Sequence, residues 1–120
     1  MKKILLIEDD PLMIEIYTKR FKESGFEVDV ATNGEEGLNK IKEKKPDLLI
    51  LDIVLPQIDG WEILRKIRED LGLKDLKVVV LSNLSRDAEV KKSLEMGAVS
   101  YLIKAHYTPT EVVNEIKKYV

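Results

Sequence analysis

Carboxylates, a hydroxyl and an amine each follow a short apolar run in this sequence. A buried strand does not end on a carboxylate unless another group compensates the charge. If the four apolar runs are parallel strands, their carboxyl ends meet at one edge of a sheet, and the polar residues after them form one site. The runs and their following residues are Ile4–Ile7 with Glu8, Asp9 and Asp10, Leu48–Leu51 with Asp52, Val78–Leu81 with Ser82, and Tyr101–Ile103 with Lys104.

The chemistry that this set favours is phosphoryl transfer. At close range the carboxylates of Glu8, Asp9 and Asp52 would repel one another, and a divalent cation that prefers oxygen ligands removes the repulsion. Mg²⁺ suits a few carboxylates together with water and a phosphate oxygen. Asp52 can then act as a nucleophile toward phosphorus. Lys104 supplies a positive charge, and Ser82 a hydroxyl, for the phosphoryl oxygens.

Composition narrows the class of protein. The chain has 120 residues, which fits one domain, and Lys and Arg total 20 against 22 Asp and Glu, for a net charge of -2. This balance lacks the excess of basic residues that is typical of nucleic-acid-binding proteins, so we expect no direct contact with nucleic acid. Cysteine is absent, which excludes disulfides and thiolate metal sites. The apolar run near Met1 is too short for a signal peptide or a membrane span, and we expect a cytoplasmic protein without membrane insertion.

Helical patterns separate the apolar runs. Pro11 fits the first helical position after Asp10, and this helix stops at Ser24-Gly25. Asn33 and Asp59 begin two further helices, the second with a buried stripe that reaches Leu71. The segment 85–96 looks helical with few apolar positions and closes at Gly97, and the capping box 108–111 begins a last helix.

This order is β-α repeated about five times, which predicts a doubly wound α/β fold. Continuous apolar strands are buried on both faces, so helices should cover both sides of a parallel sheet. Val28 and Val30 alternate with acidic residues instead, as in an edge strand. The reactive set lies at the carboxyl ends of the strands, where open α/β sheets bind ligands.

The sequence resembles the receiver domains of bacterial two-component response regulators. The resemblance covers the whole chain, 1–120, as a single receiver domain, and it implies a flavodoxin-like (βα)5 sandwich with strand order 2-1-3-4-5. Together the matching residues are highly specific, although each alone is weak. They are Glu8, Asp9, Asp10, Asp52, Pro56, Asp59, Gly60, Ser82, Gly97, Ala98, Tyr101 and Lys104.

The resemblance implies roles for these residues. Asp52 would be the phosphoacceptor. Mg²⁺ would be bound directly by Asp9 and Asp52 and by the backbone carbonyl of Val54, with Glu8 acting through metal-bound water. Ser82 and Lys104 would bind the phosphoryl group. Tyr101 would turn inward as Ser82 moves, which changes the surface of the fourth helix, fifth strand and fifth helix.

The implied partners are proteins. The phosphoryl group would come from a sensor histidine kinase or a histidine phosphotransfer protein. The changed surface, within 85–119, would regulate a downstream protein or a missing output domain. We expect a monomer when the protein is unphosphorylated. We also expect no enzyme activity beyond its own phosphoryl transfer and dephosphorylation.

Several positions depart from the family pattern. Ala105 follows Lys104 where the family has proline, often after a cis bond, and we expect a trans bond with a rearranged loop, because cis costs ~3 kcal/mol without proline. Asn83 replaces a small residue and narrows access. Val54 and Leu84 are apolar and cannot orient an attacking water, which predicts a long-lived phosphoryl group. Relatives that dimerise through the last two helices carry basic residues near the start of the final helix, where this chain has Thr110 and Glu115.

Other functions account for the residues less well. A phosphatase with an aspartyl nucleophile usually needs a second acid shortly after it, and 53–55 offers none. A dinucleotide site needs a Gly-rich turn after the first strand, where this chain is acidic. A binding module that is never phosphorylated remains open because of Asn83 and Ala105. We interpret Asp10 as a helix cap and His106 as a solvated side chain.

Overall fold

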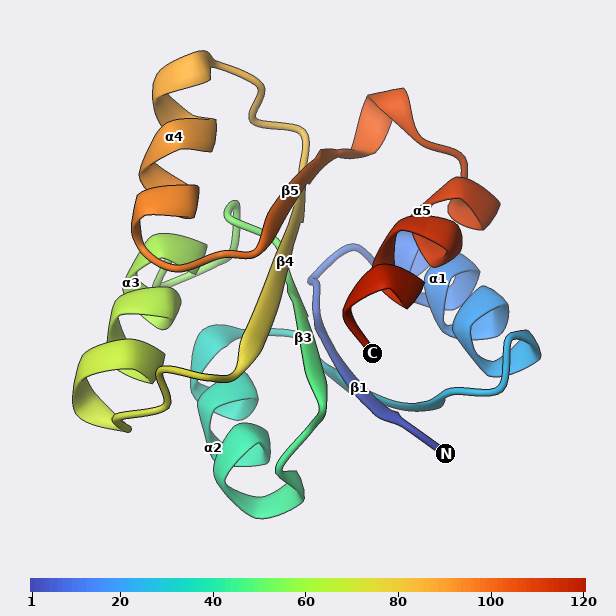
Figure 1. Ribbon diagram of the computed structural model, residues 1–120, viewed down its shortest axis with the longest axis horizontal. Helices are drawn as coiled ribbons and strands as arrows, with labels where there is room; N and C mark the ends of the chain where they lie inside the picture. Colours follow the sequence, from blue (N-terminus) through green and yellow to red (C-terminus); the bar gives the residue numbers. More distant parts are fainter.

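The computed structural model describes residues 1–120. A parallel five-stranded sheet with strand order β2-β1-β3-β4-β5 forms its centre (Figure 1). The strands are β1 (Lys3–Ile7), β2 (Glu27–Ala31), β3 (Leu48–Leu51), β4 (Lys77–Ser82) and β5 (Ser100–Ile103). The helices are α1 (Pro11–Glu23), α2 (Gly34–Lys44), α3 (Gly60–Arg65), α4 (Asp87–Glu95) and α5 (Pro109–Ile116), with a π-helix η1 (Lys66–Asp70) and 3-10 turns η2 (Lys104–His106) and η3 (Lys117–Tyr119). The predicted doubly wound architecture and strand order are confirmed.

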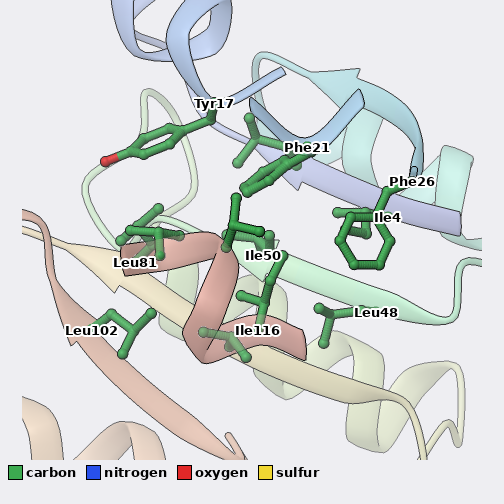
Figure 2. Close-up of a cluster of buried hydrophobic side chains, with 13 residues drawn as sticks. Ile4, Tyr17, Phe21, Phe26, Leu48, Ile50, Leu81, Leu102 and Ile116 are labelled. Atoms are coloured by element: carbon green, nitrogen blue, oxygen red, sulfur yellow. The ribbon is translucent and has the colours of Figure 1, made fainter. Parts of the chain in front are cut away.

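Two apolar layers, one on each face of the sheet, make up the core. On one face α1 and α5 cover the sheet, and Phe21 and Ile116 pack there among residues of β1, β3 and β4 (Figure 2). On the other face α2 and α3 supply Ile41, Ile63 and Leu64. β3 is buried at every position, as its uninterrupted apolar run predicts. Because β3 is fixed on both faces, the residue that follows it has a fixed place.

The predicted helix starts agree with the structure. Asp10 accepts hydrogen bonds from the N–H groups of Leu12 and Met13. Asn33 and Asp59 each accept from the N–H three residues ahead, and Thr108 forms a complete capping box with Glu111. These side chains satisfy backbone donors that have no partner inside the helix. The caps therefore fix where the chain turns into α1, α2, α3 and α5.

The third helix differs from the sequence expectation. We predicted one α-helix from Asp59 to Leu71, but α3 passes into the π-helix η1 at Lys66. The Leu71 N–H donates to the Lys66 carbonyl at 2.9 Å, five residues back. The wider turn keeps Ile67 fully buried while Arg68 bonds backbone carbonyls outside the helix.

β2 is an edge strand, as its alternating pattern predicts. The Val30 N–H donates to the Asp29 carboxylate at 2.9 Å, and the Val30 carbonyl accepts from the Lys40 ammonium at 2.5 Å. Lys40 also pairs with Asp29 at 3.0 Å, so α2 is tied to the edge of the sheet. None of the helices is both long and apolar enough to cross a membrane.

Candidate functional site

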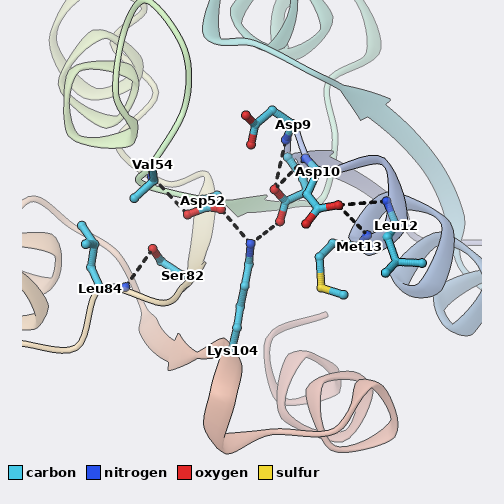
Figure 3. Close-up of polar contacts among 10 residues, drawn as sticks. Asp9, Asp10, Leu12, Met13, Asp52, Val54, Ser82, Leu84 and Lys104 are labelled. Atoms are coloured by element: carbon cyan, nitrogen blue, oxygen red, sulfur yellow. Dashed lines mark hydrogen bonds and ion pairs between the residues drawn. The ribbon is translucent and has the colours of Figure 1, made fainter.

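Asp52 lies immediately after β3 and is 6% exposed. Its backbone N–H donates to the Ile7 carbonyl at 3.1 Å, which joins it to the end of β1. Its carboxylate is held from two sides: Oδ1 accepts from the Val54 N–H at 3.1 Å, and Oδ2 lies 2.7 Å from the Lys104 ammonium (Figure 3). Asp52 is therefore positioned by the end of β1, by its own following loop and by Lys104.

Glu8 is the most buried acid of the site. One carboxylate oxygen accepts from the N–H groups of Asp9 and Asp10, at 3.0 and 3.2 Å, and the other pairs with Lys104. Burial raises the pKa of Glu8 above its ordinary value, and the nearby Asp52 raises it further, while the Lys104 hydrogen bond opposes both. The hydrogen bonds thus hold a carboxylate in a place that burial alone would disfavour.

Lys104 bridges the two buried acids. It extends from the end of β5 across the strand ends to Glu8 and Asp52, and its side chain is 11% exposed. Burial works to lower the pKa of Lys104, but the hydrogen bonds with Asp52 and Glu8 outweigh it, and the pKa is raised. The bridge was not predicted, because the sequence assigned Lys104 only to a phosphoryl oxygen.

The acids fit a divalent cation. Carboxylate oxygens of Glu8, Asp9 and Asp52 all lie within 4.8 Å of one another. The Asp9 carboxylate is exposed and has no ion-pair partner, whereas the other two share Lys104. Hard oxygen donors at this spacing, with one side open to water, are the ligands that Mg²⁺ prefers. Asp10 is outside this set, as expected of a helix cap.

Ser82 and Tyr101 meet at a common residue beside the acids. Ser82 is fully buried at the end of β4, and its hydroxyl accepts from the Leu84 N–H at 3.3 Å. The Tyr101 hydroxyl donates to the Leu84 carbonyl at 2.7 Å. Burial raises the pKa of Tyr101. Leu84 therefore connects the hydroxyl nearest the site with an aromatic side chain on β5.

The loop after Lys104 follows the expectation. Every peptide bond is trans, including Lys104–Ala105, and the chain makes the short turn η2 at this point. His106 is exposed in that turn. Sequence reasoning did not place Tyr17 near the site, yet burial raises the pKa of this residue, and Lys104, Glu8 and Asp52 all act on it electrostatically. The helical spacing of Tyr17 in the sequence predicts only that it lies on the buried face of α1.

Comparison with known proteins decides the family. The model of the response regulator receiver domain matches residues 4–117. The chain belongs to this family. It is a receiver domain of the kind found in two-component response regulators, so it is a signalling switch rather than a conventional enzyme.

Relatives of known name support this assignment. The chain is 35% identical over 118 residues to the alkaline phosphatase synthesis transcriptional regulatory protein PhoP of Bacillus subtilis, with 97% of the chain and 47% of PhoP covered. It is 39% identical over 102 residues to the transcriptional regulatory protein CusR of Escherichia coli, with 85% of the chain and 44% of CusR covered. The chain therefore spans about half the length of these relatives.

Solved receiver structures have the same fold. The response regulator TrrA of Thermotoga maritima in complex with Mg²⁺ and beryllium fluoride is 35% identical, with a TM-score of 0.87 and all of both chains covered. The BeF3-activated receiver domain of Klebsiella pneumoniae RstA is 31% identical, with a TM-score of 0.90 and coverage of 98% and 97%. Receiver domains bind Mg²⁺ at an acidic site, and this chain has a cluster of three acids, Glu8, Asp9 and Asp52, at its strand ends.

Proposed function

We propose that Asp52 accepts the phosphoryl group. The observation that carries the proposal is a carboxylate 6% exposed at a strand end, beside two further acids and a lysine. One Asp52 oxygen would attack phosphorus while the bond from phosphorus to a histidine nitrogen of the donor breaks and the imidazole leaves. Lys104, already 2.7 Å from Asp52, would follow the charge to a phosphoryl oxygen.

The acids would hold Mg²⁺ for this step. Asp9 and Asp52 would bind it directly together with the Val54 carbonyl, and Glu8 would act through bound water. When bound, the ion neutralises charge that builds up on the phosphoryl oxygens. Glu8 keeps its place through the N–H groups of Asp9 and Asp10, so it can release Lys104 to the phosphoryl group.

Ser82 and Tyr101 would convert phosphorylation into a change of surface. If the Ser82 hydroxyl donates to a phosphoryl oxygen, it draws the Leu84 backbone with it, and the bond from Tyr101 to Leu84 is exchanged. Contacts that only the phosphorylated state makes shift the population toward that state. The donor would be a sensor histidine kinase or a histidine phosphotransfer protein, and the reader a protein target or an output domain. The unphosphorylated domain would be a monomer.

The intact mass of the protein after acetyl phosphate and Mg²⁺ tests the acceptor. We expect a gain of one phosphoryl group that is lost with EDTA and in Asp52→Asn. Asp47→Asn is the matched control, because Asp47 lies at the opposite end of the same strand, bonded to the Lys3 N–H at 2.8 Å. If Asp52→Asn still gains a phosphoryl group, the acceptor is a residue other than Asp52. No gain at any time point would favour a binding module that is never phosphorylated.

The phosphoryl group should be long-lived. Val54 is 57% exposed beside Asp52, and neither its side chain nor that of Leu84 can hydrogen-bond an attacking water. Labelled protein followed in Mg²⁺ buffer should lose its label slowly, and Val54→Asn should lose it faster. Loss within seconds from the unaltered chain would contradict this prediction.

A further inference from the structure

α4 is held to the rest of the domain by a polar contact. Ser93 is its one buried residue and is fully buried. The Ser93 hydroxyl accepts from the Trp61 indole N–H at 3.0 Å and donates to the Glu89 carbonyl at 3.0 Å. The Lys92 ammonium lies 4.1 Å from the centroid of the Trp61 ring, a cation–π distance. One aromatic side chain therefore holds two successive residues in the C-terminal half of the helix.

A second contact fixes the residue just beyond the same helix end. Arg68 of η1 donates to the Gly97 carbonyl at 2.9 Å and to the Leu73 carbonyl at 2.6 Å. Gly97 has φ +99°, and a Cβ there would lie 2.9 Å from Arg68 Nε. A side chain at position 97 would be strained and would press against the guanidinium. The π-turn of η1 and the glycine thus bring the C-terminal end of α4 onto α3 and η1.

Trp61 is itself rigidly placed relative to Asp52. A Cβ on the preceding Gly60 would lie 2.5 Å from the Asp52 carbonyl and 2.6 Å from Ile53 Cα. The Gly60 N–H donates to the Ile53 carbonyl at 2.8 Å. Because α3 begins in direct contact with the acceptor strand, the indole is a fixed point for α4.

The N-terminal half of α4 has no comparable anchor. Arg86 stands at the N-cap and has no acceptor atom in its side chain, so the one side-chain hydrogen bond at this helix start is from the Arg86 N–H to the Glu89 carboxylate, at 3.0 Å. Residues 85–88 are exposed. This end follows Leu84, the residue bonded to Ser82 and Tyr101.

We propose that Trp61 and Arg68 form a pivot that holds the C-terminal half of α4 in both states of the switch. Phosphorylation then swings only the N-terminal part of α4 and the loop before it, 84–89, about this point. A partner that distinguishes the two states must contact that half together with Tyr101. The exposed Leu94 lies in the fixed C-terminal half of α4, so its position is the same in both phosphorylation states. This inference rests on the proposed function of Asp52.

Amide NMR of the protein titrated with beryllofluoride and Mg²⁺ tests the pivot, and the single Trp61 supplies one indole N–H signal. We expect large shifts near Asp52 and in 84–88, with small shifts for the indole and for 93–97. Shifts near Asp52 together with an equally large indole shift would overturn the pivot alone. If no amide signal shifts on addition of beryllofluoride and Mg²⁺, the proposed function is wrong and the pivot falls with it.

Ser93→Ala tests whether the Trp61–Ser93 bond positions the C-terminal half of α4 or only stabilises the fold. It should leave beryllofluoride binding unchanged, because the Ser93 hydroxyl bonds Trp61 and Glu89 and none of the acids. It should, however, spread the amide shifts over all of α4. Ser85→Ala, an exposed serine before the other end of the helix, is the matched control and should keep the pattern of the unaltered protein. If Ser93→Ala also keeps that pattern, the Trp61–Ser93 bond is not the pivot.

Discussion

α4 and α5 are of nearly equal length, nine and eight residues, but they are attached to the sheet in different ways. α5 buries Val112, Val113 and Ile116 and begins with a complete capping box, whereas α4 buries one serine and has half a box. Apolar packing is non-directional and is lost only when the helix leaves the sheet. A hydrogen bond can be exchanged for another at little cost. The difference indicates that α5 stays fixed and that α4, beyond its anchor at Trp61 and Arg68, can respond.

Lys104, at the start of the loop into α5, should show the largest effect. Lys104→Met leaves two buried carboxylates without their cation, and we expect a loss of about 3–5 kcal/mol of unfolding free energy. Urea unfolding in EDTA measures it. Added Mg²⁺ should recover part of the loss, because it supplies a replacement charge to the same acids.

Lys40→Met is the control for charge removal, because Lys40 pairs with a half-exposed acid and such pairs contribute about 0–1 kcal/mol. Equal losses in the two variants would show that the bridge at the strand ends contributes no more than a surface pair.

The next largest effect is the difference in unfolding free energy between substitutions in α5 and in α4. Ile116→Ala in α5 removes a fully buried side chain and should cost about 2–5 kcal/mol. Leu94→Ala in α4 removes one that is 44% exposed and should stay within about 0.5 kcal/mol. Urea unfolding of the unphosphorylated protein measures both costs. Similar costs would remove the contrast on which the fixed and responsive sides are distinguished.

Tyr101→Phe tests the responsive side. It removes the hydroxyl that bonds the Leu84 carbonyl and should cost about 1 kcal/mol. Phosphorylation of Asp52 should persist in this variant, while the accompanying amide shifts in 84–88 should shrink. Tyr119→Phe in η3 is the control. Undiminished shifts in Tyr101→Phe would exclude Tyr101 from the coupling.

The last predicted effect is a small gain of stability. Arg86 has the extended backbone of an N-cap, with φ -68° and ψ 141°, but no acceptor. Arg86→Asn supplies one and should stabilise α4 by about 0.5–1 kcal/mol. Amide hydrogen exchange in the first turn of α4 should slow. Unchanged exchange would show that the loop, rather than the missing cap, limits this end.

The fold could be predicted because local chemistry and global pattern agree. Apolar runs fix the strands, and Asp10, Asn33, Asp59 and Thr108 fix the helix starts. The coming together of Glu8, Asp9 and Asp52 followed from parallel strand ends alone.

Contacts between segments far apart in the chain were beyond that reasoning. The Trp61–Ser93 and Arg68–Gly97 bonds join residues by three-dimensional packing, and neither spacing nor residue type signals them. The π-turn that carries Arg68 is local, but it too has no signal in the sequence pattern. The same holds for Lys104, whose reach to both buried acids depends on the path of its side chain. Trp61 was expected only to pack at the start of its helix.

The edge of the sheet has a consequence for how copies of the chain meet. Glu27 and Ala31 bond toward β1, so Val30 between them presents its N–H and carbonyl outward. Both are already taken, by Asp29 and by Lys40. A strand from a second molecule finds no free donor or acceptor at this position, and two charges stand in its way. Edge-to-edge pairing of two copies along β2 is thereby interrupted at Val30.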